Sequence, residues 1–304
     1  MSRVVALTGA TGFLGLHLVK ALAGQGARIR ILTRRNPAHE FWEGIEFEAV
    51  SGRLNQPEAL AELAMGADAV IHAAGLIAAP SLAKALRANR DGARNMALAV
   101  RQHAPAAHFI HVSTLAAREP HISNYAFSKN AGEEAVRTVY ADAPHQLTII
   151  RPPALYGPWD KVTLSVFKAA GWPIIPVISR GRVSALHVTD AAQALAQLAL
   201  GPAPSGLFAL PGGDYGMDEI MAEAARAQGR SARLAHVPPA LVRAVGALSG
   251  RFGKNPVFNN GKARELLYPD WVVRPHEALP YMPNISLADG FRQTIAWYRV
   301  KNWL

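Results

Sequence analysis

The first half of the chain alternates between short apolar runs and longer segments in which apolar residues recur every three or four positions. Runs rich in Val, Ile and Leu are typical of buried strands, and the wider spacing is typical of helices with one buried face. This alternation predicts a parallel sheet with helices on both faces. We expect strands at Val4–Thr8, Arg28–Thr33, Glu46–Val50, Ala69–His72, Phe109–Ser113 and Leu147–Arg151. We expect helices at about Gly12–Ala23, Gln56–Ala64, Leu82–His103 (with an interruption at Asp91 and Gly92) and Tyr125–Val139.

The pattern changes after Arg151, where repeated prolines indicate that the chain leaves the sheet. The expected fold is α/β: a Rossmann-type doubly wound parallel sheet with a smaller C-terminal substrate-binding domain. Residues 1–158 would form the nucleotide-binding domain, to which 184–210 returns, and 159–183 with 211–304 would form the smaller part. Further elements are expected as a helix at Asp190–Leu200, a short strand at Leu207–Leu210, and helices near Asp218–Gln228, Pro239–Ser249 and Leu287–Lys301.

A glycine-rich turn joins the first expected strand to the first helix. Its glycines are Gly9, Gly12 and Gly15. A dinucleotide pyrophosphate needs such a turn, because the backbone must approach the phosphates closely and the first helical N–H groups must bind them. We therefore predict a dinucleotide site here, although a glycine turn used only for packing is the alternative. The residues expected to contact the cofactor are Gly9, Thr11, Gly12, Phe13, Leu14 and Gly15.

The end of the second strand selects between the two nicotinamide dinucleotides. An NAD site usually places an acidic residue there to bond the ribose 2′-hydroxyl. This chain has Arg34 and Arg35 instead. Guanidinium groups form forked hydrogen bonds with a phosphate, so NADP is favoured over NAD. The alternative is a pair of surface arginines without a ligand.

Thr114, Tyr125 and Lys129 are the candidate catalytic residues. Thr114 follows the fifth expected strand, and Tyr125 and Lys129 stand at i and i+4 on the next helix, one above the other. An ammonium group close to a phenol stabilises the phenolate and lowers its pKa. A tyrosine activated in this way exchanges a proton with a hydroxyl or carbonyl while hydride moves to or from a nicotinamide. The hydroxyl of Thr114 would hold the substrate oxygen.

These residues belong to a set of motifs that occur in order over about residues 1–200. The sequence resembles the short-chain dehydrogenases/reductases, in particular the extended group of NAD(P)-dependent epimerases, dehydratases and reductases. The resemblance implies that Tyr125 is the acid/base, that Lys129 also holds the nicotinamide ribose, and that Thr114 or Ser113 positions the substrate. It implies further cofactor contacts from Ala73, Ala74, Gly75, Asn89, Ser113, Pro152 and Leu155. The matching motifs are TGATGFLG (8–15), DAVIHAAG (68–75), Asn89, HVST (111–114), YAFSK (125–129), RPPALYGP (151–158) and HVTDAA (187–192).

Three departures from the family pattern qualify this resemblance. Arg53, followed by Leu54, replaces the Asp that many members use to contact adenine, so the adenine must be held differently or less tightly. Arg53 and Leu54 are still expected to contact the cofactor. Leu115 and Ala116 stand where dehydratases carry acidic residues, which argues against dehydration. The segment between Thr114 and Tyr125 is short for a sugar-nucleotide epimerase.

Composition limits the remaining possibilities. The 304 residues include no Cys, carry a net charge of +10, and contain 50% hydrophobic residues. Basic residues are scattered without an aromatic platform, so no nucleic-acid partner is expected. No metal site is expected, since His187 and Asp190 are too few ligands. We expect a cytoplasmic homodimer with a small-molecule substrate. An apolar cluster at residues 159–176 favours an apolar or lipid-like substrate if it lines the cleft, and core or dimer packing is the alternative. The apolar helix Pro239–Ser249, flanked by Arg243, Arg251 and Lys254, offers contact with a membrane surface as an alternative.

The sequence therefore predicts an NADP-dependent oxidoreductase that transfers hydride between a nicotinamide and a carbonyl or secondary alcohol. A sugar-nucleotide epimerase of the same family remains an alternative. A non-catalytic NADP(H)-binding sensor or assembly protein is the alternative from another class, and an RNA-binding relative is a weaker one. The intact pair of Tyr125 and Lys129 argues against a pure binder, which has no need of the phenol.

Overall fold

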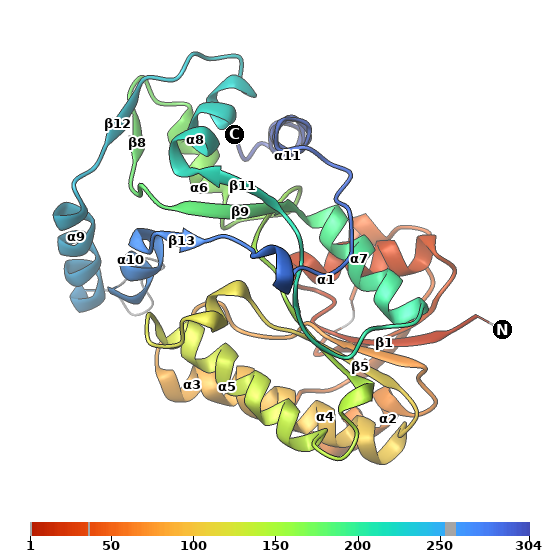
Figure 1. The fold of residues 1–304 in the computed structure, drawn as a ribbon. Coiled ribbons are helices and arrows are strands. Elements are labelled where there is room, and N and C mark those ends of the chain that lie inside the picture. The colour runs from red at the N-terminus through yellow and green to blue at the C-terminus, as the bar shows by residue number, and fades with distance from the viewer. Residues whose placement is uncertain (1, 36, 253–259) are drawn as a thin grey trace. The chain divides into compact units, whose positions relative to one another are not determined.

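The computed structural model describes residues 2–35, 37–252 and 260–304. The chain folds as two compact units (Figure 1). Unit 1 contains Met1–Arg151 and Ala191–Ala209, and unit 2 contains Pro152–Asp190 and Leu210–Leu304. The chain therefore passes between the units three times, after Arg151, Asp190 and Ala209.

Unit 1 is built on a seven-stranded sheet in the order β10-β6-β5-β4-β1-β2-β3. All of its pairings are parallel. The central strands β1, β4 and β5 are buried at almost every position, as expected when helices cover both faces of the sheet. The sheet confirms the predicted Rossmann-type α/β fold. Its strands are β1 (Val4–Thr8), β2 (Arg28–Thr33), β3 (Glu48–Ser51), β4 (Ala69–His72), β5 (His108–Val112), β6 (Leu147–Arg151) and β10 (Gly206–Ala209).

Helices lie on both faces of this sheet (Figure 1). The face covered by α2, α4 and α5 has a core that includes Leu63, Met96, Phe109 and Tyr140, all fully or almost fully buried. α1 and the part of α7 that belongs to unit 1 lie on the opposite face. The helices are α1 (Phe13–Gly24), α2 (Pro57–Ala64), α3 (Leu82–Leu86), α4 (Gly92–His103), α5 (Asn124–Val139) and α7 (Val188–Leu200).

The third predicted helix differs from its expectation. It is not interrupted at Asp91 and Gly92, because a π-helical turn over Arg87–Asp91 joins α3 to α4 without a break. Gly92 allows Leu54 to pack closely, since a Cβ atom on Gly92 would lie 2.7 Å from Cδ1 of that leucine. The glycine that suggested a break therefore serves packing.

The third predicted strand is displaced toward the C-terminus. We expected Glu46–Val50, whereas β3 is Glu48–Ser51. Phe47 instead packs edge-to-face on Trp42, with ring centroids 5.5 Å apart. The parallel register then begins with Glu48 opposite Arg30. The bounds of the other predicted elements differ from those observed by at most a few residues, which is within the usual ambiguity of element ends.

Unit 2 combines two small sheets with helices. In the larger sheet β9 pairs with β11, β13 and β7, and in the smaller one β8 pairs in parallel with β12. Its core joins Phe167, Ile220, Phe291 and Tyr298. The strands are β7 (Ala154–Tyr156), β8 (Ile175–Val177), β9 (Arg182–His187), β11 (Gly213–Gly216), β12 (Leu234–His236) and β13 (Asp270–Trp271). The helices are α6 (Leu164–Ala170), α8 (Met217–Arg226), α9 (Pro239–Phe252), α10 (Asn260–Leu267) and α11 (Leu287–Val300).

Asp190 fixes a loop of unit 2. Its carboxylate accepts hydrogen bonds from the backbone N–H groups of Asn284, at 3.2 Å, and Ile285, at 2.9 Å. The side chain is buried, so these donors satisfy a carboxylate that would otherwise be costly to bury.

In the described part of the chain, no helix is long and apolar enough to cross a membrane.

Candidate active site

The glycine turn between β1 and α1 has no room for side chains at two of its three glycines. A Cβ atom on Gly9 would lie 2.6 Å from the backbone nitrogen of Ala74, and one on Gly15 would lie 2.0 Å from the carbonyl oxygen of Gly9. Gly9 also has a φ of 79°, which L-residues rarely adopt. No side-chain oxygen caps α1 at Gly12. The first turn of α1 therefore offers N–H groups and the positive end of its dipole to an anion.

Arginines follow the carboxyl ends of two neighbouring strands. Arg34 and Arg35 come after β2, and Arg53 comes after β3. The register places Thr33 opposite Ser51, and the N–H of Gly52 donates to the carbonyl of Thr33 at 2.8 Å. The three arginines are exposed, and within residues 2–35, 37–252 and 260–304 no carboxylate forms an ion pair with any of them. This edge of the sheet thus carries several guanidinium groups without an internal counter-charge.

The end of β4 is tied to β1 and to the π-helical turn. The hydroxyl of Thr8 lies 2.8 Å from Nδ1 of His72, and it also accepts a hydrogen bond from the N–H of Ala74 at 3.3 Å. Asn89, in the π-helical turn, is almost fully buried. Its amide oxygen accepts from the N–H of Leu76 at 2.7 Å, and its amide nitrogen donates to the carbonyl of the same residue at 3.0 Å. These bonds fix the segment that contains the predicted cofactor residues 73–75.

The side chain of Asn89 also reaches the helix that carries the candidate base. Its amide nitrogen donates to the hydroxyl of Ser128 at 2.9 Å, and that hydroxyl donates to the carbonyl of Tyr125 at 2.9 Å. Gly132 permits the close approach, because a Cβ atom there would lie 2.5 Å from the carbonyl oxygen of Asn89. The π-helical turn and the first turns of α5 are therefore one packed assembly.

Thr114 and Tyr125 come from two consecutive elements. Thr114 follows β5 and begins a short 3-10 helix, where its hydroxyl accepts from the N–H of Ala116 at 3.3 Å. Tyr125 lies in the first turn of α5, which Ser123 caps by accepting the N–H of Ala126 at 3.0 Å. Thr114 and Tyr125 are each half-buried. Both residues thus lie at element ends, where polar side chains remain accessible to a ligand.

Lys129 is one turn further along α5 and is buried, with 5% of its surface exposed to solvent. Its ammonium donates to the carbonyl of Val112 at 2.7 Å, and a Cβ atom on Gly75 would lie 3.7 Å from it. Burial lowers the pKa of Lys129 from 10.5 to about 8, and the negative charge of Glu133 opposes that decrease. The lysine therefore sits where the ends of β4 and β5 meet α5.

The two strand-end histidines are buried and neutral. Burial, followed by the charge of Lys129, lowers the pKa of His72 to about 3 and that of His111 well below its usual value. Their rings stack with centroids 5.6 Å apart. Both rings are therefore packed as core side chains at the ends of β4 and β5. In the described residues, no three His, Asp or Glu side chains converge to hold a metal ion.

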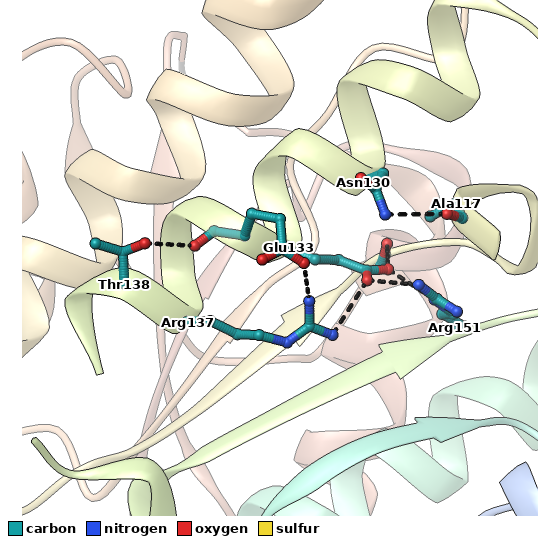
Figure 2. A network of polar contacts seen from close by, with 8 residues as sticks. Ala117, Asn130, Glu133, Arg137, Thr138 and Arg151 are labelled. Carbon is teal, nitrogen blue, oxygen red and sulfur yellow. Dashed lines mark hydrogen bonds and ion pairs between the residues drawn. The ribbon is translucent and has the colours of Figure 1, made fainter. Parts of the chain in front are cut away.

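A buried carboxylate connects α5 to the ends of β5 and β6 (Figure 2). Glu133 is fully buried. It accepts bonds from both Nε and Nη2 of Arg151, at 2.8 and 2.7 Å, and from the hydroxyl of Ser113 at 2.6 Å. Nη2 of Arg137 adds a longer contact to the Glu133 carboxylate at 3.4 Å, and Nη1 of the same arginine pairs with Glu134 on the surface. Asn130 donates to the carbonyl of Ala117 at 3.2 Å and fixes α5 to the 3-10 helix.

Sequence reasoning did not identify Glu133, Ser128 or Asn130 as parts of this assembly. A signal for the first was present, because Glu133 stands four residues after Lys129 and so lies on the same inward face of α5. Ser113 is expected to contact the cofactor, and in the structure its hydroxyl donates to Glu133. An acidic residue on a buried helix face requires a cationic partner, and Arg151 supplies it.

Not every predicted contact falls within unit 1. Pro152 and Leu155 belong to unit 2, where Leu155 lies in β7. Leu54 packs against Gly92, and its carbonyl accepts from the side chain of Asn95 at 2.9 Å. Unit 1 by itself brings together the glycine turn, the segment 73–75, Asn89, Thr114, Tyr125 and Lys129, with the arginines at the ends of β2 and β3.

Comparisons with known proteins agree with this arrangement. The model of the NAD dependent epimerase/dehydratase family matches residues 5–203. A ceramide reductase of Caulobacter vibrioides is 47% identical over 311 residues, which cover 99% of this chain and 96% of that protein. A 4-hydroxy-2-methyl-3-oxo-4-farnesyl-3,4-dihydroquinoline-1-oxide ketoreductase of Stigmatella aurantiaca is 26% identical over 80% of this chain and 78% of its own.

The fold has counterparts among solved structures. The crystal structure of gox2253 is similar over all of both chains, with a TM-score of 0.81 and 20% identity. At that identity the likeness concerns the fold. The family match covers well over half of the chain, and the resemblance read from the motifs is confirmed. The chain therefore belongs to the NAD dependent epimerase/dehydratase family and is an enzyme of the short-chain dehydrogenase/reductase type.

Proposed function

We propose that this oxidoreductase uses NADPH to reduce a carbonyl group on a ceramide-like lipid to an alcohol. The observation that carries the proposal is the 47% identity with a ceramide reductase along nearly the full length of both chains. The second ketoreductase relative also has a farnesyl-bearing compound in its name, which is consistent with an apolar substrate. The proposal takes up the apolar substrate that the sequence left open and specifies a lipid.

The residues of unit 1 fit a nicotinamide dinucleotide. The space that a Cβ atom would fill at Gly9 and Gly15 is taken by backbone, so the turn is as tight as a pyrophosphate site requires. Arg34, Arg35 and Arg53 supply donors for a 2′-phosphate, which supports NADPH over NADH. Arg53 stands where many family members have the Asp that contacts adenine. In this proposal it binds the 2′-phosphate instead.

The chemistry needs one hydride and one proton. NADPH, when bound, supplies the hydride to the carbonyl carbon. The phenol of Tyr125 donates its proton to the carbonyl oxygen, so the product is a secondary alcohol. The hydroxyl of Thr114 holds that oxygen, and the buried ammonium of Lys129 stabilises the phenolate that remains. Proton uptake from solvent then restores the phenol.

Replacement of Tyr125 by Phe tests this assignment. The variant should lose about 10²- to 10⁴-fold in turnover of a ceramide-type ketone with NADPH, because general acid catalysis contributes that much. Its affinity for NADPH should be unchanged. Tyr140→Phe is the matched control, since the buried hydroxyl of Tyr140 has no hydrogen-bond partner in the described structure and lies at the other end of α5.

The outcomes separate the alternatives. Full turnover by Tyr125→Phe would contradict the proton-donor role. Conversion of a UDP-sugar without net consumption of NADPH would favour the epimerase. Tight NADPH binding with no turnover of any ketone would favour a non-catalytic binder.

A further inference from the structure

Two segments of unit 2 contain no acidic residue. No Asp or Glu occurs between Asp160 and Asp190, or between Glu223 and Glu265, although both segments carry Lys and Arg. The first segment contains β8 and the second contains β12, and these strands pair in parallel. α9 follows β12 after a short connection, as Figure 1 shows. The side chains of this ribbon and helix therefore contribute positive charge alone.

Over the part of α9 whose side chains the structure describes, residues 239–247, the helix lacks the polar outer face of an ordinary surface helix. Arg243 is its sole charged residue between Pro239 and Ala247. Val242 is buried, whereas Leu241 and Val245, one turn apart on another stripe, are 54% and 45% exposed. A helix that is apolar on all sides is normally covered on all sides. Within the described residues, the protein covers only one stripe of α9.

α8 provides the contrast within the same unit. It buries Ile220 and Met221 and exposes Asp218 and Glu219, as an amphipathic surface helix does. Both helices belong to unit 2, so the composition of α9 is not a general property of that unit. The exposed apolar stripe of α9 is local.

The segments that lead into β8 and β12 add exposed apolar side chains and arginines. Trp172 and Ile174, which precede β8, are 59% and 61% exposed, and Leu234 at the start of β12 is 37% exposed. The guanidinium of Arg230 donates to the carbonyl of Gly171 at 2.7 Å, directly before Trp172. The carbonyl of Arg233, directly before Leu234, accepts the N–H of Ile175 at 2.8 Å.

We propose that these residues form a surface that binds an anionic lipid membrane. The basic–apolar surface is defined by Trp172, Ile174, Leu234, Leu241 and Val245, with Arg230, Arg233 and Arg243. Aliphatic and Trp side chains enter the boundary between head groups and acyl chains, and nearby arginines bind anionic head groups. A nucleic-acid surface would instead need stacking aromatics and has no use for exposed Leu, Ile and Val.

This inference goes beyond the proposed function, because membrane binding requires neither cofactor nor substrate. Flotation of the purified full chain with vesicles is the test. The wild type should float with vesicles of phosphatidylglycerol and phosphatidylcholine and should float at least tenfold less with phosphatidylcholine alone. High salt should weaken the binding, since part of it is electrostatic.

Paired variants locate the surface. Leu241→Glu with Val245→Glu should reduce flotation at least tenfold, and Arg233→Gln with Arg243→Gln should remove its dependence on salt. Met65→Glu with Leu98→Glu is the matched control, because it adds the same charge at exposed apolar positions of unit 1. All of the substituted side chains are exposed, and circular dichroism with thermal unfolding checks that each variant is folded.

Three results would overturn the proposal. The first is a wild type that does not float with anionic vesicles. The second is an equal loss in the Met65/Leu98 control, which would mean that net charge alone matters. The third is a Leu241/Val245 variant that floats normally but changes a dimer to a monomer in sedimentation, which would assign the stripe to a second copy of the chain. Reductase activity is measured separately, so failure here leaves the proposed reaction standing.

Discussion

Unit 1 has arginines of two kinds at the carboxyl ends of its strands: one that is buried beside a carboxylate, and three that are exposed without one. Arg151, the last residue of β6, is mostly buried and makes a two-pronged ion pair with the fully buried Glu133. Arg34, Arg35 and Arg53, after β2 and β3, are exposed and have no carboxylate partner among the described residues. The positive charge of Arg151 is therefore neutralised within the fold. The positive charge of the three exposed arginines can be neutralised by an external phosphate.

Burial beside a carboxylate marks an arginine that holds the fold together, whereas exposure without a carboxylate marks one that can bind a ligand. Residue type alone does not separate the two. A buried ion pair is expensive to break, because the remaining charge loses its partner in a place that water does not reach. An exposed arginine without a partner contributes little to folding and remains available to a ligand. Substitutions in the two groups should therefore affect different measurements.

Glu133→Ala should have the largest effect. It leaves the guanidinium of Arg151 buried without its carboxylate, and breaking a buried pair in this way costs about 3–5 kcal/mol. The free energy of unfolding in urea measures the loss. Glu134→Ala is the control, since Glu134 is the adjacent residue, is exposed, and pairs only at the surface. Equal stability of the two variants would contradict the structural role of the Glu133 pair.

Arg34→Ala and Arg35→Ala should each weaken NADPH binding about tenfold, or about 1.4 kcal/mol, and leave NADH binding unchanged. The reason is that each removes a donor to the 2′-phosphate, which NADH lacks. Parallel calorimetric titrations with the two cofactors measure the effect, and the urea midpoint should stay at the wild-type value. A parallel fall in NADH affinity would show that these arginines contact another part of the dinucleotide.

Glu133→Gln tests the electrostatic effect of the same carboxylate on Lys129. Burial lowers the pKa of Lys129 to about 8, so activity that depends on its ammonium should decline above about pH 8. Glu133 opposes this decrease, and its neutralisation should therefore move the alkaline decline of turnover to lower pH. An unchanged pH profile with reduced stability would restrict Glu133 to the structural role.

The lysine also has a consequence for folding. Because the pKa of Lys129 is lower in the folded protein than its ordinary 10.5, the unfolded chain binds more protons between about pH 8 and 10.5. Its contribution to the free energy of unfolding should therefore rise with pH across that window. Lys129→Met should remove this rise, as urea titrations at several pH values would show.

Arg182→Ala should have the smallest effect and sets the baseline for the others. Arg182 in unit 2 pairs with Asp214 at 2.9 Å, and both side chains are about half exposed. Solvent weakens such a pair, so neither the urea midpoint nor cofactor affinity should change measurably. A clear loss of NADPH affinity would show that the response to arginine removal is not specific to the ends of β2 and β3.

Much of the fold could be predicted from the sequence because its signals are local. The strand Val4–Thr8 is a continuous apolar run, and the glycine turn follows it directly. The helix at Leu82–His103 was found from its periodicity, but its π-helical turn was not, because Gly92 indicates a break and serves close packing instead. The displaced third strand depends on the contact between Trp42 and Phe47, which pattern alone does not reveal.

The candidate site shows the same limit. Tyr125 and Lys129 were found because their spacing lies within one helix. The pair of Glu133 and Arg151 joins α5 to β6, and Arg53 comes next to Arg34 only through the parallel register of β2 and β3. Such pairings depend on which strands are neighbours, and strand order is a property of the whole sheet.

The strand order also bears on how the protein is made in the cell. Six strands of the unit 1 sheet have been synthesised when the ribosome reaches Arg151, but β10, which covers the outer edge of β6, begins only at Gly206. At ordinary elongation rates this interval lasts roughly 3 to 10 s. During that time the apolar strand β6 has an open hydrogen-bonding edge, the kind of edge through which nascent chains aggregate. The passage of the chain through unit 2 before β10 thus prolongs the time for which this edge of the nascent sheet stays uncovered.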